Sequence, residues 1–313
     1  MNNAPLRLIF MGTPDFAVST LESLLAWPGG QVVAVVTAPD RPAGRGRQLQ
    51  ASAVKVAAEA AGLPILQPTN LKSPEFQAEL KSYAADLQVV VAFRMLPEAV
   101  WNMPRLGSIN IHASLLPQYR GAAPINWALI HGDTETGVSS FFLRHEIDTG
   151  DLILQDKIPI APTEDFGSLY DKLKVAGAAL ARRSVEAIAA GTAPSTPQPN
   201  TPDLRPAPKL TKETGRLDFQ QPAAALVNLV RGLAPIPTAF ATLPDGRTLK
   251  VFRAAALPFE AAPAEPGTWH SDGKKYLRVA TPSGWLDLLD VQAEGKKRMG
   301  VEEFLRGTKS FNS

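Results

Sequence analysis

Asn110 and His112 are the residues of clearest chemical interest, two positions apart in the segment GSINIHASLLP (107–117). Side chains two positions apart on a β-strand point to the same face, so we expect the amide and the imidazole side by side. Polar groups on a buried strand cost free energy unless they are satisfied or used. The pair is therefore a catalytic candidate, with a satisfied pair of core residues as the alternative.

A carboxylate that could complete this pair lies in the loop EIDTGD (146–151). The glycine in this loop allows a turn that folds back over the end of the strand. Asp148 and Asp151 both fit the pattern, and the sequence alone does not choose between them.

Asn, His and Asp without a protein nucleophile suit a reaction in which the substrate supplies the nucleophile. An amide can donate to a developing oxyanion, and a cationic imidazole can stabilise that oxyanion and protonate the leaving group. A carboxylate can orient the imidazole or accept a proton from an attacking amine. The combination predicts acyl transfer without an acyl-enzyme. Ser114 would permit a Ser-His-Asp triad, but the Gly-x-Ser-x-Gly elbow of such nucleophiles is absent.

The first 150 residues alternate short apolar runs with helical patterns, which indicates βαβ units and a parallel sheet. The runs VVAVVT (32–37) and VVVAF (89–93) are apolar on both faces, as expected for strands covered by helices on both sides of the sheet. Thr13 followed by Pro14 predicts a helix N-cap, in a turn that lacks the glycines of a dinucleotide fingerprint. We predict a doubly wound, mostly parallel, Rossmann-like sheet, which binds ligands at the carboxyl ends of its strands.

The remaining chain predicts a strand pair over 136–160 and a long helix that ends before Gly191. Residues 191–208 are rich in proline, which favours an extended connector. Beyond it, the short strand patterns TAFATL, TLKVFRA, YLRVA and WLDLLDV predict a small β-barrel resembling an OB-fold. The predicted organisation is a catalytic domain at 1–190, a linker at 191–208 and a β-barrel at 209–313.

Composition narrows the classes of function. The chain is 45% hydrophobic and has no apolar run near the roughly 20 residues that a membrane helix needs. The N-terminus lacks the pattern of a signal peptide, so we expect a cytoplasmic protein. We also expect a monomer. The absence of Cys excludes thiolate nucleophiles, and four His without ligand spacing predict that no metal is bound.

Charge is unevenly distributed along the chain. Residues 1–204 hold 16 Lys and Arg against 19 Asp and Glu, a net −3, whereas residues 205–313 hold 16 against 11, a net +5. A basic C-terminal module suggests a polyanionic partner, with a merely soluble cationic domain as the alternative. The candidate phosphate contacts in this part are Lys209, Lys212, Lys296, Lys297 and Arg298.

A second basic feature is the segment PDRPAGRGRQL (39–49), where Arg41, Arg45 and Arg47 stand among Pro and Gly. Such a cationic loop could follow phosphates or enter the end of an RNA duplex. A solvated loop is the alternative.

The motif N-I-H-x-S-L-L-P, followed by YRGAAPINWAL and TGVSSFFLRHEIDTGDLI, resembles the folate-dependent formyltransferases. The resemblance implies that Asn110, His112 and Asp148 form the catalytic set and that 10-formyltetrahydrofolate is the formyl donor. It also implies a pocket for the donor lined by Ser114, Leu115, Leu116 and Pro117.

Further motifs resemble the members of that family that formylate methionyl initiator tRNA: GTPDFA (12–17), the arginine segment, K-L-T-K from Lys209 and GKKRM (295–299). The resemblance runs nearly end to end. It implies a transferase of translation initiation, with methionyl initiator tRNA and the folate co-substrate as partners. AFRMLP (92–97) departs from the A-Y-G-x-x-L-P of many members, because Arg94 replaces a glycine at the pterin end of the implied folate pocket.

Three other functions remain open. A formyltransferase acting on a sugar amine or another small amine, such as a glycinamide nucleotide, would not need the arginine segment. A formyl-folate hydrolase would replace the amine with water. A non-catalytic RNA-binding protein could keep the same scaffold, but unused polar groups on a buried strand argue against it.

Overall fold

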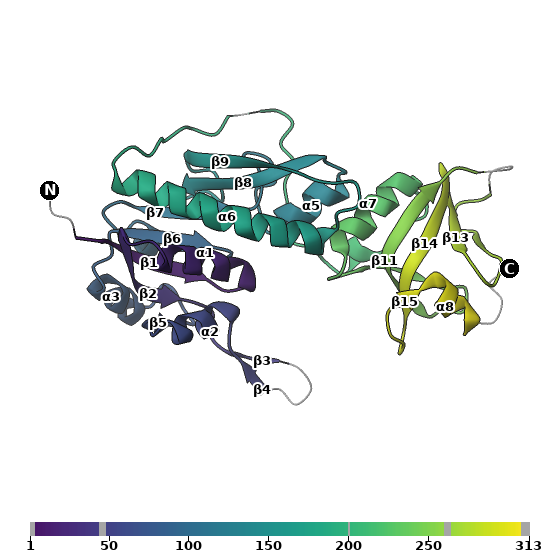
Figure 1. The fold of residues 1–313 in the computed structure, drawn as a ribbon, viewed down its shortest axis with the longest axis horizontal. Helices are drawn as coiled ribbons and strands as arrows, with labels where there is room; N and C mark the ends of the chain where they lie inside the picture. The colour runs from purple at the N-terminus through teal and green to yellow at the C-terminus, as the bar shows by residue number, and fades with distance from the viewer. Residues whose placement is uncertain (1–3, 44–47, 200, 260–263, 308–313) are drawn as a thin grey trace. The chain divides into compact units, whose positions relative to one another are not determined.

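The computed structural model describes residues 4–43, 48–199, 201–259 and 264–307 (Figure 1). The chain divides into two compact units. Unit 1 comprises residues 1–121, 136–158 and 170–206, and unit 2 comprises residues 122–135, 159–169 and 207–313. By its contacts, most of the proline-rich connector belongs to unit 1. The domain boundaries that the sequence suggested stay a prediction.

Unit 1 is built on a seven-stranded sheet with the order β5-β2-β1-β6-β7-β8-β9. Neighbours from β5 to β7 pair in parallel, and β7 pairs with β8 in antiparallel fashion. The predicted mostly parallel sheet is therefore confirmed. The strands are β1 (Leu6–Gly12), β2 (Gly30–Val36), β5 (Ile65–Leu66), β6 (Leu87–Val91), β7 (Ser108–His112), β8 (Glu135–Phe142) and β9 (Leu152–Pro159).

Helices cover both faces of this sheet, as the apolar strands predicted (Figure 1). On one face, Phe76 and Val100 join a buried cluster with Met11 of β1. On the other face, Gly177 lies against Ile111 of β7. The helices are α1 (Asp15–Leu25), α2 (Ala53–Ala60), α3 (Pro74–Ser82), α4 (Glu98–Trp101) and α6 (Phe166–Ala189).

The first turn after β1 differs from the expectation. Pro14, not Thr13, occupies the N-cap of α1, and it makes no side-chain cap hydrogen bond. Instead, the backbone N–H of Phe16 donates to the hydroxyl of Tyr170 on α6, at 3.0 Å. The prediction of Thr13 as the cap is wrong, because a hydroxyl far along the chain satisfies this first-turn donor.

The arginine segment forms a hairpin. β3 (Arg41–Ala43) and β4 (Gln48–Gln50) pair in antiparallel fashion, with Arg41 opposite Gln50. Arg45 and Arg47 lie outside the described residues.

Unit 2 contains a six-stranded sheet whose recorded pairs along β10-β11-β14-β13-β12, and between β14 and β15, are antiparallel. Its core includes Leu226 and Val230 of α7 packed with Leu249 and Val251 of β11. The predicted β-rich C-terminal part is confirmed. Closure into a barrel stays a prediction, because the pairings recorded among the described residues form a path with two ends.

The elements of unit 2 are α5 (Pro124–Ile130), the 3-10 helix η1 (Glu213–Gly215), α7 (Ala223–Leu233), β10 (Ala239–Thr242), β11 (Thr248–Leu257), β12 (Trp269–Ser271), β13 (Leu277–Thr281), β14 (Gly284–Ala293), β15 (Met299–Gly300) and α8 (Val301–Arg306). Across the described ranges of both units, no helix has the length and apolar character that a membrane crossing requires.

Candidate active site

His112 is the last residue of β7, at the carboxyl end of a parallel strand. Its Nε2 lies 2.8 Å from the backbone carbonyl oxygen of Tyr119. Because a carbonyl oxygen only accepts, Nε2 carries a hydrogen and donates it. The side chain of His112 is 8% exposed. This hydrogen bond orients the ring and leaves Nδ1 as the nitrogen available for proton exchange.

Asp148 faces that nitrogen. Its Oδ2 lies 3.8 Å from Nδ1 of His112 and accepts a hydrogen bond from the backbone N–H of Gly121 at 2.9 Å. Its φ of +54° is a left-handed conformation that Asp adopts more readily than most residues. The side chain is 11% exposed, so its charge attracts a protonated imidazole more strongly than it would in open water.

Asp151, the alternative carboxylate, is engaged elsewhere. Its Oδ2 accepts hydrogen bonds from Nη2 of Arg144 at 2.7 Å and from Oγ of Ser195 at 2.9 Å. The structure thus brings Asp148 to His112 and commits Asp151 to other partners.

Asn110 lies in register between Val90 of β6 and Phe141 of β8. Its Oδ1 is buried and has no hydrogen-bond partner among the described residues. A buried acceptor without a donor costs roughly 1–3 kcal/mol. The amide therefore has hydrogen-bonding capacity that the described protein groups leave unused and that a bound substrate could satisfy.

Hydrogen bonds to neighbouring segments hold the SLLP turn in place. The hydroxyl of Ser114 donates to the carbonyl oxygen of Gln118 at 2.6 Å, so it is not paired with His112 as a triad would require. The backbone N–H of Leu116 donates to Oγ of Ser139 at 3.1 Å. Ser114 and Leu116 are buried, whereas Leu115 and Pro117 are partly exposed. A role for these residues in holding the folate stays a prediction.

Sequence reasoning missed the backbone groups that hold the pair. The carbonyl of Tyr119 binds His112 and the N–H of Gly121 binds Asp148. Backbone atoms leave no mark in residue type, but Gly121 has a φ of +123°, which explains a glycine at that point. The tripeptide Y-R-G, which begins one residue after the SLLP turn, was the available signal.

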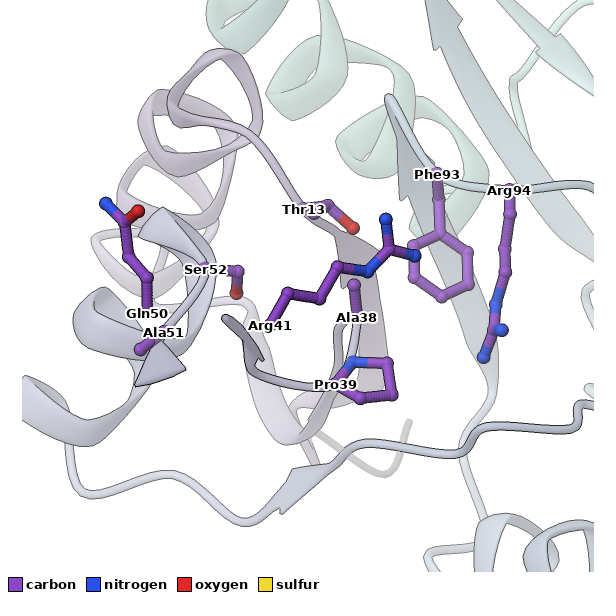
Figure 2. A pocket seen from close by; sticks show the side chains of 9 residues that line it. All are labelled: Thr13, Ala38, Pro39, Arg41, Gln50, Ala51, Ser52, Phe93 and Arg94. Carbon is purple, nitrogen blue, oxygen red and sulfur yellow. The ribbon is translucent and has the colours of Figure 1, made fainter. Parts of the chain in front are cut away.

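A cavity of about 300 Å³ lies in unit 1 beside the arginine hairpin (Figure 2). Thr13 follows β1, Ser52 caps α2, and Phe93 and Arg94 follow β6. Arg94, which the resemblance places at the pterin end of a folate pocket, lines this cavity together with Arg41. The full lining is Thr13, Ala38, Pro39, Arg41, Gln50, Ala51, Ser52, Phe93 and Arg94.

The candidate RNA contacts of unit 2 divide into two kinds. Lys209, Lys212, Lys296 and Lys297 are exposed. Arg298 donates two hydrogen bonds to Oδ2 of Asp290, and this partner raises the pKa of Arg298 above its ordinary value. Its guanidinium also lies 4.4 Å from the ring centre of Phe252. Arg298 is therefore already paired within the protein.

An imidazole, a carboxylate and an amide N–H donor at one strand end can stabilise an oxyanion and move a proton. In the described ranges, no group of three or more His, Asp or Glu side chains could hold a metal ion.

Family models account for most of the chain. Residues 6–185 match the model described as formyl transferase, and residues 209–309 match the model described as formyl transferase, C-terminal domain. The chain belongs to the formyl transferase family. The family that the sequence motifs suggested is confirmed.

Curated relatives in the formyl transferase family are similar over nearly their whole length. The methionyl-tRNA formyltransferase of Bacteroides fragilis (strain ATCC 25285) is 51% identical over 314 residues, which cover 98% of this chain and 96% of the relative. The methionyl-tRNA formyltransferase of Parabacteroides distasonis is 50% identical over 324 residues, which cover 99% of this chain and 98% of the relative.

Solved structures of other formyl transferases share the fold. A sugar 3N-formyl transferase, WlaRD, crystallised in the presence of dTDP and 5-N-formyl-THF, matches with a TM-score of 0.67 at 16% identity, covering 94% of this chain and 100% of that one. An N-formyltransferase from Helicobacter canadensis, in complex with folinic acid and dTDP-3-aminofucose, matches with a TM-score of 0.66 at 17% identity and the same coverage. At such identities the likeness shows the fold alone.

Proposed function

We propose that this formyl transferase moves the formyl group of 10-formyltetrahydrofolate to the α-amino group of methionyl initiator tRNA, for translation initiation. The observation that carries the proposal is the 50–51% identity to methionyl-tRNA formyltransferases over nearly the full length of each chain. The distant sugar formyltransferases share only the fold.

The reaction needs no protein nucleophile. The amine nitrogen attacks the formyl carbon and a C–N bond forms. The bond from that carbon to N10 of the folate breaks, the amine loses a proton and N10 gains one. The attacking amine must be neutral, and a free α-amine with a pKa of about 8 keeps a usable neutral fraction near pH 7.

Each residue of the site has a separate part in this scheme. The amide of Asn110 donates to the developing oxyanion through its Nδ2–H group, and its buried Oδ1, which has no partner among the described residues, can accept a hydrogen bond from the substrate. The Nδ1 of His112 exchanges the proton, because its Nε2 is held by Tyr119. Asp148 stabilises the imidazolium and accepts the proton of the amine.

The remaining predicted residues place the substrates. We propose that Leu115 and Pro117 contact the folate through their partly exposed side chains, while Ser114 and Leu116 shape the turn beneath them. The arginine hairpin and the basic C-terminal domain, residues 209–313, hold the tRNA. The enzyme acts as a monomer in the cytoplasm.

A single competition assay tests the proposal. Labelled 10-formyltetrahydrofolate is supplied with methionyl initiator tRNA, a sugar amine, glycinamide ribonucleotide or water alone, and the labelled products are separated. We expect label on the methionyl-tRNA alone. Label on the sugar amine or on glycinamide ribonucleotide at an equal or higher rate would show a small-amine formyltransferase. Release of formate with water alone would show a hydrolase.

A further inference from the structure

Two guanidinium groups border the cavity beside the hairpin. In Figure 2 the side chain of Arg41 points toward Phe93 and Arg94. Arg94 is fixed in place, because its Nη1 donates to the carbonyl of Thr69 at 3.1 Å and its Nη2 donates to the carbonyl of Pro68. Partial shielding from water by the surrounding chain, followed by the nearby charge of Arg41, lowers the pKa of Arg94 from its ordinary value. The two cations therefore border the same cavity, with the ring of Phe93 between them in Figure 2.

No carboxylate on the cavity balances these charges. None of the nine lining residues is acidic. Asp40, next to Arg41 in the chain, binds Nζ of Lys55 at 2.6 Å and Nε2 of Gln67 at 2.8 Å, so its charge is already neutralised. Two like charges held together in this way are stabilised by an anion between them. A guanidinium can donate two parallel hydrogen bonds to two oxygens of one phosphate, which an ammonium cannot.

The cavity and the catalytic pair lie on the same edge of the sheet. Thr13 follows the carboxyl end of β1, Arg94 follows that of β6, and His112 ends β7. These three strands are neighbours and parallel, so the ends of β1 and β7 lie about 10 Å apart. That distance is comparable to the length of a ribose that carries an ester-linked amino acid. An amine at His112 would therefore place the nearest phosphate of its nucleotide close to the cavity.

We propose that Arg41 and Arg94 bind a phosphate group of the terminal nucleotides at the acceptor end of the tRNA, an inference that rests on the proposed function. The hydroxyls of Thr13 and Ser52 add hydrogen-bonding groups on the same cavity. The phosphate anchors the end of the chain while the aminoacyl group extends to Asn110 and His112. Arg94 takes part in substrate recognition through a residue type that many family members lack at this position.

Steady-state kinetics on the full chain tests the site. Arg41→Ala and Arg94→Ala should each raise KM for methionyl-tRNA roughly 10-fold to 100-fold, because each loses a charge-assisted hydrogen bond. KM for 10-formyltetrahydrofolate should not change. Affinity for a short single-stranded RNA that ends in a free 3′ hydroxyl is then measured at several salt concentrations. In each variant the negative slope of log K against log salt should become shallower by up to about 0.7. Arg94→Lys should keep most of the salt dependence, because it keeps the positive charge. It should still raise KM for methionyl-tRNA, because an ammonium cannot donate the paired hydrogen bonds of a guanidinium.

Arg105→Ala is the matched control. Arg105 is 67% exposed and pairs with Asp86 at the amino end of the strands, so the same charge is removed from the opposite edge of the sheet. It should change neither KM nor the slope. If both cavity variants behave like Arg105→Ala, the phosphate site is wrong. If they raise KM for the folate instead, the cavity belongs to the folate pocket and the phosphate site is likewise wrong. A wild-type chain that leaves methionyl-tRNA unformylated would instead refute the proposed function.

A different observation carries a second inference, about the proline-rich connector. Nε2 of Gln198 donates to the backbone carbonyls of Asp148 and Gly150, both at 2.8 Å. Its Oε1 accepts from Nε and Nη2 of Arg120, at 3.1 and 2.6 Å. Beside it, Thr196 and Leu152 exchange two backbone hydrogen bonds. The amide of Gln198 thus links the loop of Asp148 to residues 119–121, whose backbone groups bind His112 and Asp148.

We infer that Gln198 is a positioning residue for the catalytic pair. Only an amide offers donors to two carbonyls and an acceptor to a guanidinium from one side chain. The link fixes the separation of the two segments and so the 3.8 Å approach of Asp148 to His112. The connector is therefore part of the active site as well as a link between parts of the chain.

Gln198→Ala should lower kcat by about 10-fold to 100-fold, the scale expected of a displaced catalytic group, and leave KM for both substrates unchanged. Gln198→Glu should not rescue kcat, because a carboxylate cannot donate to the two carbonyls. Ser195→Ala is the matched control, since it removes a hydrogen bond of the same segment to Asp151. The thermal unfolding midpoint of each variant is also measured. An unchanged midpoint shows that a loss of kcat comes from a displaced Asp148 and not from misfolding. Equal kcat for Gln198→Ala and Ser195→Ala, or a rise in KM at constant kcat, would overturn the assignment.

Discussion

The catalytic strand end and the arginine cavity are both in unit 1, but their charged side chains differ in burial and in pairing. His112 and Asp148 are almost fully buried, and each is fixed by a backbone group. Arg41 and Arg94 are exposed, and no ion pair is recorded for either among the described residues. In the first region, His112 and Asp148 have hydrogen-bond partners and the Oδ1 of Asn110 has none among the described residues. The second region holds two positive charges that no carboxylate recorded in the described part of the chain balances.

This difference follows from what each region must do. Groups that stabilise a transition state act most strongly when they are fixed and shielded from water before the substrate arrives. Groups that capture a polyanion gain from being exposed and unbalanced, because long-range attraction and ion release supply the binding energy. Substitutions in the first region should therefore change kcat, and substitutions in the second should change substrate affinity and its dependence on salt.

The largest effect is expected at the strand end. Asn110→Ala and His112→Ala should each lower kcat about 10²- to 10³-fold, the cost of losing one oxyanion donor. The fold of Asn110→Ala should survive, because the buried Oδ1 of Asn110 has no partner among the described residues. Single-turnover formylation of methionyl-tRNA, with circular dichroism of each variant, measures both. A folded variant with near wild-type turnover would remove its residue from the catalytic set.

A slightly smaller effect is expected from the neighbouring carboxylate. Asp148→Asn keeps the size but removes the charge 3.8 Å from Nδ1 of His112, so kcat should fall by roughly 10²-fold. Asp151→Asn should alter only the contacts with Arg144 and Ser195 and leave kcat close to wild type. The two variants are compared in the same formylation assay. Equal losses would mean that distance to His112 does not decide the role.

The sequence predicted the elements of the site better than the contacts between them. Strand alternation placed Asn110 and His112 on one face, because a period of two needs only local information. The choice of Asp148 over Asp151 depended on a turn whose φ of +54° the sequence does not reveal. The part played by Gln198 depends on hydrogen bonds to backbone carbonyls some 50 positions away, which no residue pattern encodes. The failure of Thr13 as a cap has the same origin, a distant Tyr170.

The exposed lysines of unit 2 should show the affinity effect without a catalytic one. Replacing any one of Lys209, Lys212, Lys296 and Lys297 by Ala should lower the slope of log affinity for tRNA against log salt by up to about 0.9, if it contacts a phosphate. Arg298→Ala should change the slope less, because Asp290 already neutralises Arg298. Binding titrations at several salt concentrations measure the slopes, and kcat at saturating tRNA should stay constant. Unchanged slopes in all four lysine variants would place the tRNA elsewhere.

The smallest effect is expected at Asp40, which lies next to Arg41 in the chain and forms an ion pair with Lys55. The hydrogen bond from Lys55, followed by that from Gln67, holds the pKa of Asp40 below its ordinary value of 3.8. A carboxyl with a lowered pKa in the folded state stabilises the fold above its ordinary pKa, and this contribution disappears as the pH falls through the folded value. Asp40→Asn should therefore unfold at a slightly lower denaturant concentration than wild type at pH 7, with the difference shrinking below pH 3.8. The effect is small because Asp40 and Lys55 are partly solvated. Denaturant midpoints of both proteins across this pH range measure it. A gap that persists undiminished in acid would show that Asp40 acts through shape and not through charge.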